Sequence, residues 1–437
     1  MARPTRSAHR TSGWCGVSTR KAPPTRVSLV KRSVEEHLEA VLGRVTALPA
    51  FDQPLMEALG LVLAEDIVSG VSLPGFDNSA MDGYAVRAED LAGATAESPV
   101  TLAVVGEQRA GRPEPTMVTP GKCIRIMTGA PMPRGADSVV QVEWTDGGTV
   151  NVRIEKQPAL GQSVRRFGED VKAGEQVLER DTLLGPRQIA VLAAVGRARV
   201  KARPRPRVVV ISTGSELREL GGALGDGQIY DSNSYTMAAC ARAAGAEVYR
   251  VGVVDDDAKK IMDTLMDQLS RADLVITTGG VSMGAYDVVK EVLAKTGTVD
   301  FPSVAMQPGK PQGFGVLGPD EVPIFTLPGN PVSAYVSFEV FVRPALRKLM
   351  GLMPYQRSLA HAVALDEFKS PPGRRQFVRA AARLGDEGWM ASTVGGHGSH
   401  LLGGLSRANA LIVVPEDVTS VRAGDQVELL LLDEETR

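Results

Sequence analysis

The chain has 437 residues, a length typical of several domains rather than one. Its 49 Lys and Arg residues nearly balance its 51 Asp and Glu residues, and the formal net charge of −2 gives no general attraction to nucleic acid or membranes. Three widely spaced cysteines argue against a disulfide framework or a cysteine zinc site, and the absence of an apolar run near 18 residues argues against a spanning helix, so we expect a cytoplasmic protein.

The N-terminal residues 1–32 contain eight Lys and Arg residues and no acidic residue. This composition predicts a basic disordered tail, with an organelle transit peptide as the alternative. Order is expected from Ser33, which has capping-box spacing to Glu36 and precedes apolar residues at helical intervals up to Val45. A second helix is expected to begin near Pro54.

Residues 72–163 are rich in Gly and Pro and contain short β-like runs at 100–105, 122–127, 138–143 and 150–154. They predict a β-rich lid inserted into an N-terminal linker domain, which is made of residues 33–71 and 164–204. A further helix is expected near 187–195.

Strand and helix patterns alternate through residues 205–352, which predicts an α/β domain with a parallel sheet. Strands are expected at 208–212, 247–254, 274–277 and 324–327, and helices at 234–244, 258–269, 286–293 and 332–350. The remaining residues, 356–437, return to β-like runs and predict a small C-terminal barrel or sandwich.

The stretch 277–290 reads TTGGVSMGAYDVVK and lies between a predicted strand and a predicted helix. A glycine-rich turn at the start of a helix directs backbone N–H groups toward an anion. The stretch therefore predicts a loop that binds a phosphorylated ligand, with Asp287 placed for a metal or a proton.

Two other motifs overlap this region of the sequence. Gly280 to Gly284 also fits the G-x-S-x-G nucleophile elbow around Ser282, for which His361, His397 and His400 are the late histidine candidates. The dinucleotide pattern G-x-G-x-x-G at 313–318 is followed at once by Pro319, so it cannot open a helix and is rejected as a cofactor site.

Ligands of parallel α/β sheets bind at the carboxyl ends of the strands. The loops 213–216, 255–257, 277–284 and 328–331 should therefore face one crevice. Four carboxylates lie at or just after these loops: Glu216, Asp231, Asp256 and Asp287. Each could cap the start of a helix. Alternatively they could bind Mg²⁺, which favours carboxylates together with substrate phosphates.

An anion pocket is predicted next to this crevice. Lys310 lies in a rigid Pro-Gly-Lys-Pro turn, and the Pro-Gly-Asn-Pro stretch at 328–331 opens a helix, so a fixed cation would meet a helix N-terminus. Basic and polar residues of the C-terminal domain, among them Arg374, Arg375, Arg379 and the segment 395–400, would complete it or would remain solvated charges.

Together these motifs resemble the molybdopterin molybdenumtransferase family, the molybdenum insertases. The matching stretches occur in family order and lie at 74–85, 125–131, 166–170, 212–217, 277–290, 308–311 and 328–333. The resemblance covers the chain from about residue 33 to its C-terminus.

The resemblance implies a four-domain, multidomain α/β protein that forms an elongated homodimer. It also implies the reaction: molybdate is inserted into adenylylated molybdopterin, with Mg²⁺ or a similar ion, which yields molybdenum cofactor and AMP. Apo-molybdoenzymes and the molybdopterin adenylyltransferase are the implied protein partners.

By motif position, the resemblance implies catalytic roles for Asp82, Thr128, Asp170, Glu216, Asp256, Asp287 and Lys310, of which Glu216, Asp256 and Asp287 would hold the metal. The lid residues among them would act partly on the partner subunit's cleft. The implied substrate-binding residues are Thr213, Gly214, Gly279, Gly280, Ser282, Gly284, Pro328, Pro331, Ser333, Ser399 and either Arg375 or Arg379.

The sequence departs from the family pattern just before the Pro-Gly-Lys-Pro turn. Ser303 stands where family members usually carry a lysine, and Gln307 stands where some carry another. Two alternatives therefore stay open beside the insertase: a molybdopterin adenylyltransferase, and a paralogue that binds the pterin with impaired turnover.

Overall fold

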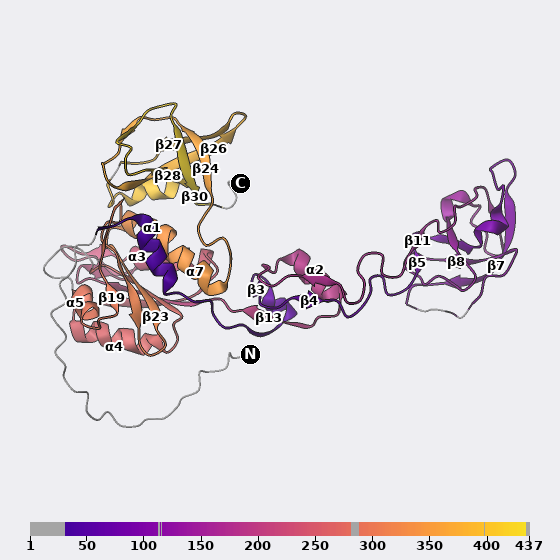
Figure 1. The fold of residues 1–437 in the computed structure, drawn as a ribbon, viewed down its shortest axis with the longest axis horizontal. Coiled ribbons are helices and arrows are strands. Elements are labelled where there is room, and N and C mark those ends of the chain that lie inside the picture. Colours follow the sequence, from indigo (N-terminus) through magenta and orange to yellow (C-terminus); the bar gives the residue numbers. More distant parts are fainter. Residues whose placement is uncertain (1–30, 112–113, 115, 281–287, 397, 434–437) are drawn as a thin grey trace, which may run out of the picture.

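The computed structural model describes residues 31–111, 114, 116–280, 288–396 and 398–433. Figure 1 shows an elongated molecule with the β-rich lid at one end, the linker domain in the middle, and the α/β and C-terminal domains together at the other end. Within the described residues, no helix combines the length and the hydropathy needed to cross a membrane.

The described chain begins with strand β1 (Lys31–Arg32), which pairs in parallel with β20 (Ser303–Val304). Regular structure is therefore present two residues before the expected start at Ser33, and the predicted tail up to residue 30 lies outside the described residues. Helix α1 (Val34–Gly43) follows, and Ser33 and Glu36 make both bonds of the predicted capping box.

The second helix expected near Pro54 is wrong. Strand β2 (Phe51–Pro54), a single 3₁₀ turn η1 (Leu55–Ala58) and strands β3 (Val62–Leu63) and β4 (Ile67–Val68) occupy this stretch. Gly60 has a φ of +77°, which ends the turn before a helix can form.

The returning half of the linker domain completes these elements. Strand β13 (Arg199–Arg203) lies between β2 and β3, and helix α2 (Pro186–Ala194) confirms the predicted helix. Strand β12 (Gln176–Leu178) pairs with β4, so the lid is joined to the linker domain by two paired segments of chain.

The lid is built on a five-stranded sheet in the order β10-β7-β8-β6-β9. The predicted β-like runs form β7 (Val100–Gln108), β8 (Lys122–Ile126), β9 (Ser138–Gln141) and β10 (Asn151–Ile154), and the sequence analysis did not identify β6 (Gly83–Val86). Strands β5 (Asn78–Ser79) and β11 (Val164–Arg165) form a separate pair beside it.

The α/β domain has a six-stranded sheet in the order β17-β14-β18-β23-β22-β19. Its first four strands are parallel, as expected: β17 (Glu247–Val254), β14 (Arg207–Thr213), β18 (Leu274–Thr278) and β23 (Val322–Leu327). Helix α3 (Asn233–Ala243) packs on one face with α1, whereas α4 (Ala258–Leu269) and α5 (Val288–Ala294) belong to the core on the other.

Two strands that the sequence analysis did not identify extend the sheet at one edge. Strand β22 (Gly313–Leu317) is antiparallel to β23, because Gly318, with a φ of +72°, allows a tight turn between them, and β19 (Val299–Asp300) is antiparallel to β22. The glycine pattern at 313–318 thus forms a strand and a turn, which confirms that it is not a dinucleotide loop.

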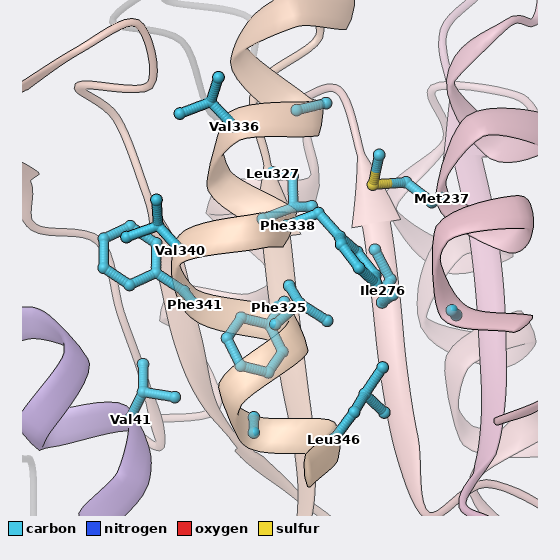
Figure 2. Packing of buried hydrophobic residues seen from close by; sticks show 14 of the residues in the cluster. Val41, Met237, Ile276, Phe325, Leu327, Val336, Phe338, Val340, Phe341 and Leu346 are labelled. Carbon is cyan, nitrogen blue, oxygen red and sulfur yellow. The ribbon is translucent and has the colours of Figure 1, made fainter. Parts of the chain in front are cut away.

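The long helix expected at 332–350 is continuous but has three parts. Helix α6 (Pro331–Ser337) passes through a π-helical segment η4 (Phe338–Val342) into α7 (Arg343–Met350). The π-helical segment, which is wider than an α-helix, directly precedes the turn that contains Pro344, and the ring and missing N–H of this proline disturb a regular α-helix. Figure 2 shows Phe338 and Phe341 of this segment packed between the sheet and Val41 of α1.

The C-terminal domain is a barrel closed by five strands in the order β26-β27-β24-β30-β28, with β28 returning to β26. These strands are β24 (Leu359–Ala364), β26 (Arg375–Gly385), β27 (Gly388–Thr393), β28 (Ala410–Val414) and β30 (Gln426–Leu431). The sequence analysis did not identify β27. Strand β21 (Met306–Gln307) of the α/β domain pairs with the start of β26 and joins the two domains.

Candidate active site

Three of the predicted loops meet where β14, β18 and β23 end. The Gly279 N–H donates a hydrogen bond of 3.1 Å to the carbonyl oxygen of Leu327, at the end of the neighbouring strand. A Cβ atom on Gly279 would lie 2.7 Å from the Thr213 carbonyl oxygen, and one on Gly329 would lie 3.7 Å from the Gly279 Cα. The loops predicted to face one crevice therefore meet at the ends of these strands, and glycine is required at position 279, where a Cβ atom would clash with the Thr213 carbonyl oxygen.

Two of the predicted metal ligands flank the loop after β14. Asp256 accepts a hydrogen bond of 3.1 Å from the Ser215 N–H, and a Cβ atom on Gly214 would lie 2.7 Å from both Glu216 carboxylate oxygens. Both carboxylates thus lie against one short segment. Asp287, like Ser282 and Gly284, lies outside the described residues, and within those residues no three acidic, His or Cys side chains gather to hold a metal.

Asp231, the fourth carboxylate of the crevice, has a structural role. It is fully buried and accepts hydrogen bonds of 3.0 Å from both the Ser212 hydroxyl and the Ser234 N–H. The Ser234 hydroxyl bonds the second oxygen. These contacts fix the start of α3, which favours the helix-cap reading of this residue over the Mg²⁺ reading.

Three further polar groups belong to these loops and to the start of α3. The hydroxyls of Thr213 and Thr277 are buried and have no hydrogen-bond partner among the described residues. The Asn233 amide donates 2.7 Å to the Gly329 carbonyl oxygen and ties α3 to the loop before α6. The sequence analysis named Thr213 and the loop that begins at Thr277, but it did not identify Asn233, for which the sequence gives no signal.

The start of α6 meets a loop of the C-terminal barrel. Asn330 donates 2.9 Å to the Ser399 hydroxyl, and the Val332 N–H donates 3.1 Å to the Ser399 carbonyl oxygen. Pro331 occupies the first turn, where its missing N–H costs nothing, and Ser333 behind it is buried. The predicted residues Ser333 and Ser399 are therefore close together.

Arg375 and Arg379 occupy different surroundings although both lie on β26. Arg375 forms ion pairs with Glu35 of α1 and, at 3.3 Å, with Glu416. Arg379 is buried, which lowers the pKa of its guanidinium, and it donates to the carbonyl oxygens of Gly396 and Leu401.

Of the two arginines, Arg379 borders a small cavity of about 20 Å³ together with Gln307, Pro308 and Val332. Lys310 follows in the same turn and its side chain is exposed. A buried guanidinium, the start of α6 and Pro308 of the lysine-bearing turn therefore border one small space, and a guanidinium and a helix start are groups that bind oxyanions.

The remaining predicted residues lie in the lid and in the paired segments that attach it, and the lid is far from the α/β domain within one chain (Figure 1). Asp82 accepts hydrogen bonds from the Thr128 N–H (2.7 Å) and hydroxyl (2.9 Å). The Asp170 N–H donates 3.0 Å to the Leu73 carbonyl oxygen, and its side chain is exposed. The predicted site is thus divided into two groups of residues.

Comparison with known protein families covers most of the chain. The model described as "MoeA N-terminal region (domain I and II)" matches residues 32–196, "Probable molybdopterin binding domain" matches 209–348, and "MoeA C-terminal region (domain IV)" matches 361–432.

Named relatives agree with these matches. The chain is 48% identical over 405 residues to "Molybdopterin molybdenumtransferase 2" of Mycobacterium tuberculosis, covering 91% of this chain and 99% of that one. It is 40% identical to "Molybdopterin molybdenumtransferase" of Haemophilus influenzae, covering 86% and 92% of the two chains. A solved MoeA structure from "Pyrococcus horikosii" superposes with a TM-score of 0.78 at 33% identity, covering 92% and 99%.

Proposed function

The chain belongs to the MoeA family of molybdopterin molybdenumtransferases, and from this premise we propose that its α/β crevice and anion pocket together form the site of molybdenum insertion. The protein is a transferase of molybdenum cofactor synthesis. Adenylylated molybdopterin and molybdate are the proposed substrates, and AMP is the proposed leaving product.

The meeting of the loops after β14, β18 and β23 supports the crevice as the nucleotide and phosphate site. Glu216 and Asp256 lie against the same short segment and offer the oxygen ligands that Mg²⁺ prefers. These residues fit a bound Mg²⁺ that also contacts the substrate phosphates. The metal would neutralise the charge that develops when the phosphoanhydride breaks.

The pocket beside α6 supports molybdate binding. Molybdate is a compact dianion, and the Arg379 guanidinium and the α6 N-terminus provide charge and hydrogen-bond donors at this pocket. Ser333 and Ser399 would add hydroxyls from the adjoining contact between α6 and the barrel. Lys310 would add an exposed cation from the turn that begins at Pro308. We propose Arg379 as the anion-binding arginine because Arg375 is already paired with two carboxylates.

We further propose a cytoplasmic homodimer in which the lid of one subunit serves the crevice of the other. The separation of Asp82, Thr128 and Asp170 from the crevice within one chain supports this arrangement (Figure 1). A pure adenylyltransferase would need only the α/β domain, so the lid and the barrel favour insertion over that alternative.

The function is tested by AMP release from adenylylated molybdopterin with purified full-length protein, while molybdate and Mg²⁺ are varied. We expect molybdate-dependent release that falls at least about a hundredfold in Glu216→Gln or Asp256→Asn, since each removes a charge from the metal site. Asp263→Asn, an exposed change on α4, is the matched control and should keep wild-type rates.

Two results would contradict the proposal. AMP release that is independent of molybdate would indicate a hydrolytic or adenylyl-transfer activity instead. Tight pterin binding without AMP release in the wild type would identify the impaired paralogue.

A further inference from the structure

The anion pocket beside Arg379 has three walls, which come from three different parts of the chain. Gln307 and Pro308 form the turn wall, Val332 of α6 forms the helix wall, and β26 together with the segment 394–396 forms the barrel wall. The size of the pocket therefore depends on how these three parts are held relative to one another.

Backbone contacts hold the barrel wall against each of the other two. Gln307 of β21 is paired with Gln376 of β26, which joins the turn wall to the barrel wall. The Val332 N–H donates a hydrogen bond of 3.1 Å to the Ser399 carbonyl oxygen, which joins the helix wall to the barrel domain. The third joint, between the turn wall and the helix wall, is made by a side chain.

That side chain is the amide of Gln312, which follows the turn at 308–311. Its Nε2 donates 2.6 Å to the Gly309 carbonyl oxygen in the turn and 2.7 Å to the Ser337 hydroxyl of α6. Gln312 is 2% exposed and Ser337 is fully buried. A Cβ atom on Gly309 would lie 2.9 Å from the Ser337 hydroxyl oxygen, so the turn lies directly on the helix at this point.

Gln312 can act on the pocket without touching a bound anion. It does not belong to the described residues that border the cavity, and Ser337 lies one helical turn behind Ser333 on the same face of α6. Breaking either bond of the buried amide would leave a buried polar group unpaired, which is costly. The side chain therefore holds the turn wall at a fixed separation from the helix wall.

We propose that Gln312 is a positioning residue that sets the width of the anion pocket, and thereby selects molybdate over a smaller tetrahedral dianion such as sulfate. This inference rests on the proposed function, because it takes the pocket to be the molybdate site. A pocket with fixed walls makes all of its contacts only with an anion that fills it, whereas a pocket with one loosened wall can close around a smaller anion.

The test uses molybdate-dependent AMP release with sulfate as a competitor of molybdate. Gln312→Met keeps the length of the side chain and removes both hydrogen bonds. We expect the ratio of the sulfate Ki to the molybdate KM to fall about threefold to tenfold, the range that corresponds to one or two neutral hydrogen bonds. The KM for adenylylated molybdopterin should stay at its wild-type value, because the turn wall borders only the anion pocket.

Two further variants distinguish positioning from stability. Adding Ser337→Ala to Gln312→Met removes the hydroxyl that would otherwise be left unpaired, so part of any loss of melting temperature should be recovered while the ratio stays low. Gln268→Met is the matched control. Gln268 is a buried glutamine of α4 that bonds Asp267 and Arg271, and its replacement should lower the melting temperature without changing the ratio.

The results separate this inference from the function on which it rests. A wild-type protein without molybdate-dependent release overturns the proposed function. An active wild type whose ratio is unchanged in Gln312→Met and in the double variant overturns the role of Gln312. An equal fall of the ratio in Gln268→Met also overturns it, because the effect would then follow stability alone.

Discussion

Asp82 and Thr128 come from lid segments 46 residues apart, yet the backbone N–H and the hydroxyl of Thr128 both donate to the same Asp82 oxygen. The backbone bond, followed by the hydroxyl bond, stabilises the charged form and lowers the pKa of the Asp82 carboxyl. The carboxylate is thus kept ionised in acid solution.

Removing one of these bonds should be visible in the pH dependence of the reaction. In Thr128→Val the hydroxyl bond is lost and the backbone bond stays, so the pKa of Asp82 rises toward its ordinary value. We expect the acid limb of kcat/KM to move to higher pH, measured as AMP release across pH 3–6.

Thr128→Ser keeps a hydroxyl at this position and is the control for that experiment. It should retain the wild-type acid limb. An identical profile for the valine variant would exclude Asp82 as a group whose ionisation matters in the reaction.

The sequence supported some residue assignments better than others. Glu216 and Asp256 follow consecutive strands of a parallel sheet, so strand order alone predicts that they are near each other. Arg375 and Arg379 are four positions apart on one strand and project from the same face. The choice between them depends on Glu35, which is 340 residues distant from Arg375.

At the level of elements, α1 shows how a buried side chain links packing to pH. His37 is buried beneath the π-helical segment, with its ring 4.7 Å from that of Phe341 in an edge-on arrangement. Burial, with a smaller contribution from the charge of Arg32, lowers the pKa of His37 to about 3.

This shift predicts acid sensitivity of the folded protein. Between pH 6.5 and about 3 the unfolded chain binds a proton at His37 that the folded chain does not, so the free energy of unfolding falls as the pH is lowered. The contribution is about 1.4 kcal/mol per pH unit, or roughly 2 kcal/mol at pH 5.

His37→Leu should remove this dependence. We expect urea unfolding between pH 5 and 7.5 to show a smaller loss of stability in the variant than in the wild type, whatever the absolute stability of each. If stability falls equally with pH in the variant and in the wild type, His37 binds its proton as readily in the folded chain as in the unfolded chain.

The regular elements of the α/β domain were predictable because apolar periodicity is strong where helices cover both faces of a sheet. The 3₁₀ turn η1 and the antiparallel strands β19 and β22 were not. Tight turns at Gly60 and Gly318 end η1 and connect β22 to β23. A glycine in the sequence indicates that a turn is possible, but it does not indicate which strands will pair on either side of it.

On the scale of the whole molecule, the predicted site residues are divided between the lid end and the end that holds the α/β and C-terminal domains (Figure 1). A closed two-fold dimer can join the lid of one subunit to the crevice of the other without any movement of the lid. Length and composition predicted several domains, but neither contains information on the distance between them.

Subunit mixing tests this arrangement. Asp82→Ala and Glu216→Ala should each be inactive alone, whereas a refolded equimolar mixture should recover about a quarter of the wild-type activity, because half of the dimers are mixed and each has one intact site.

A mixture of Glu216→Ala with Asp256→Ala is the control for that experiment. Both changes lie in the same crevice, so every site in a mixed dimer carries one of them. No recovery in the first mixture would place the whole site within one chain. Recovery in this control would show that Glu216 and Asp256 do not act in the same crevice.

The lid is attached by two paired segments, with β4 bonded to β12 and Leu73 bridged to Val171. A ribbon of this kind has a register, so a residue added to one segment misaligns the other. Changes of length during evolution must therefore occur as compensated pairs, one in each segment. The distance between the lid and the linker domain therefore depends on both segments together, although these segments are about a hundred positions apart in the chain.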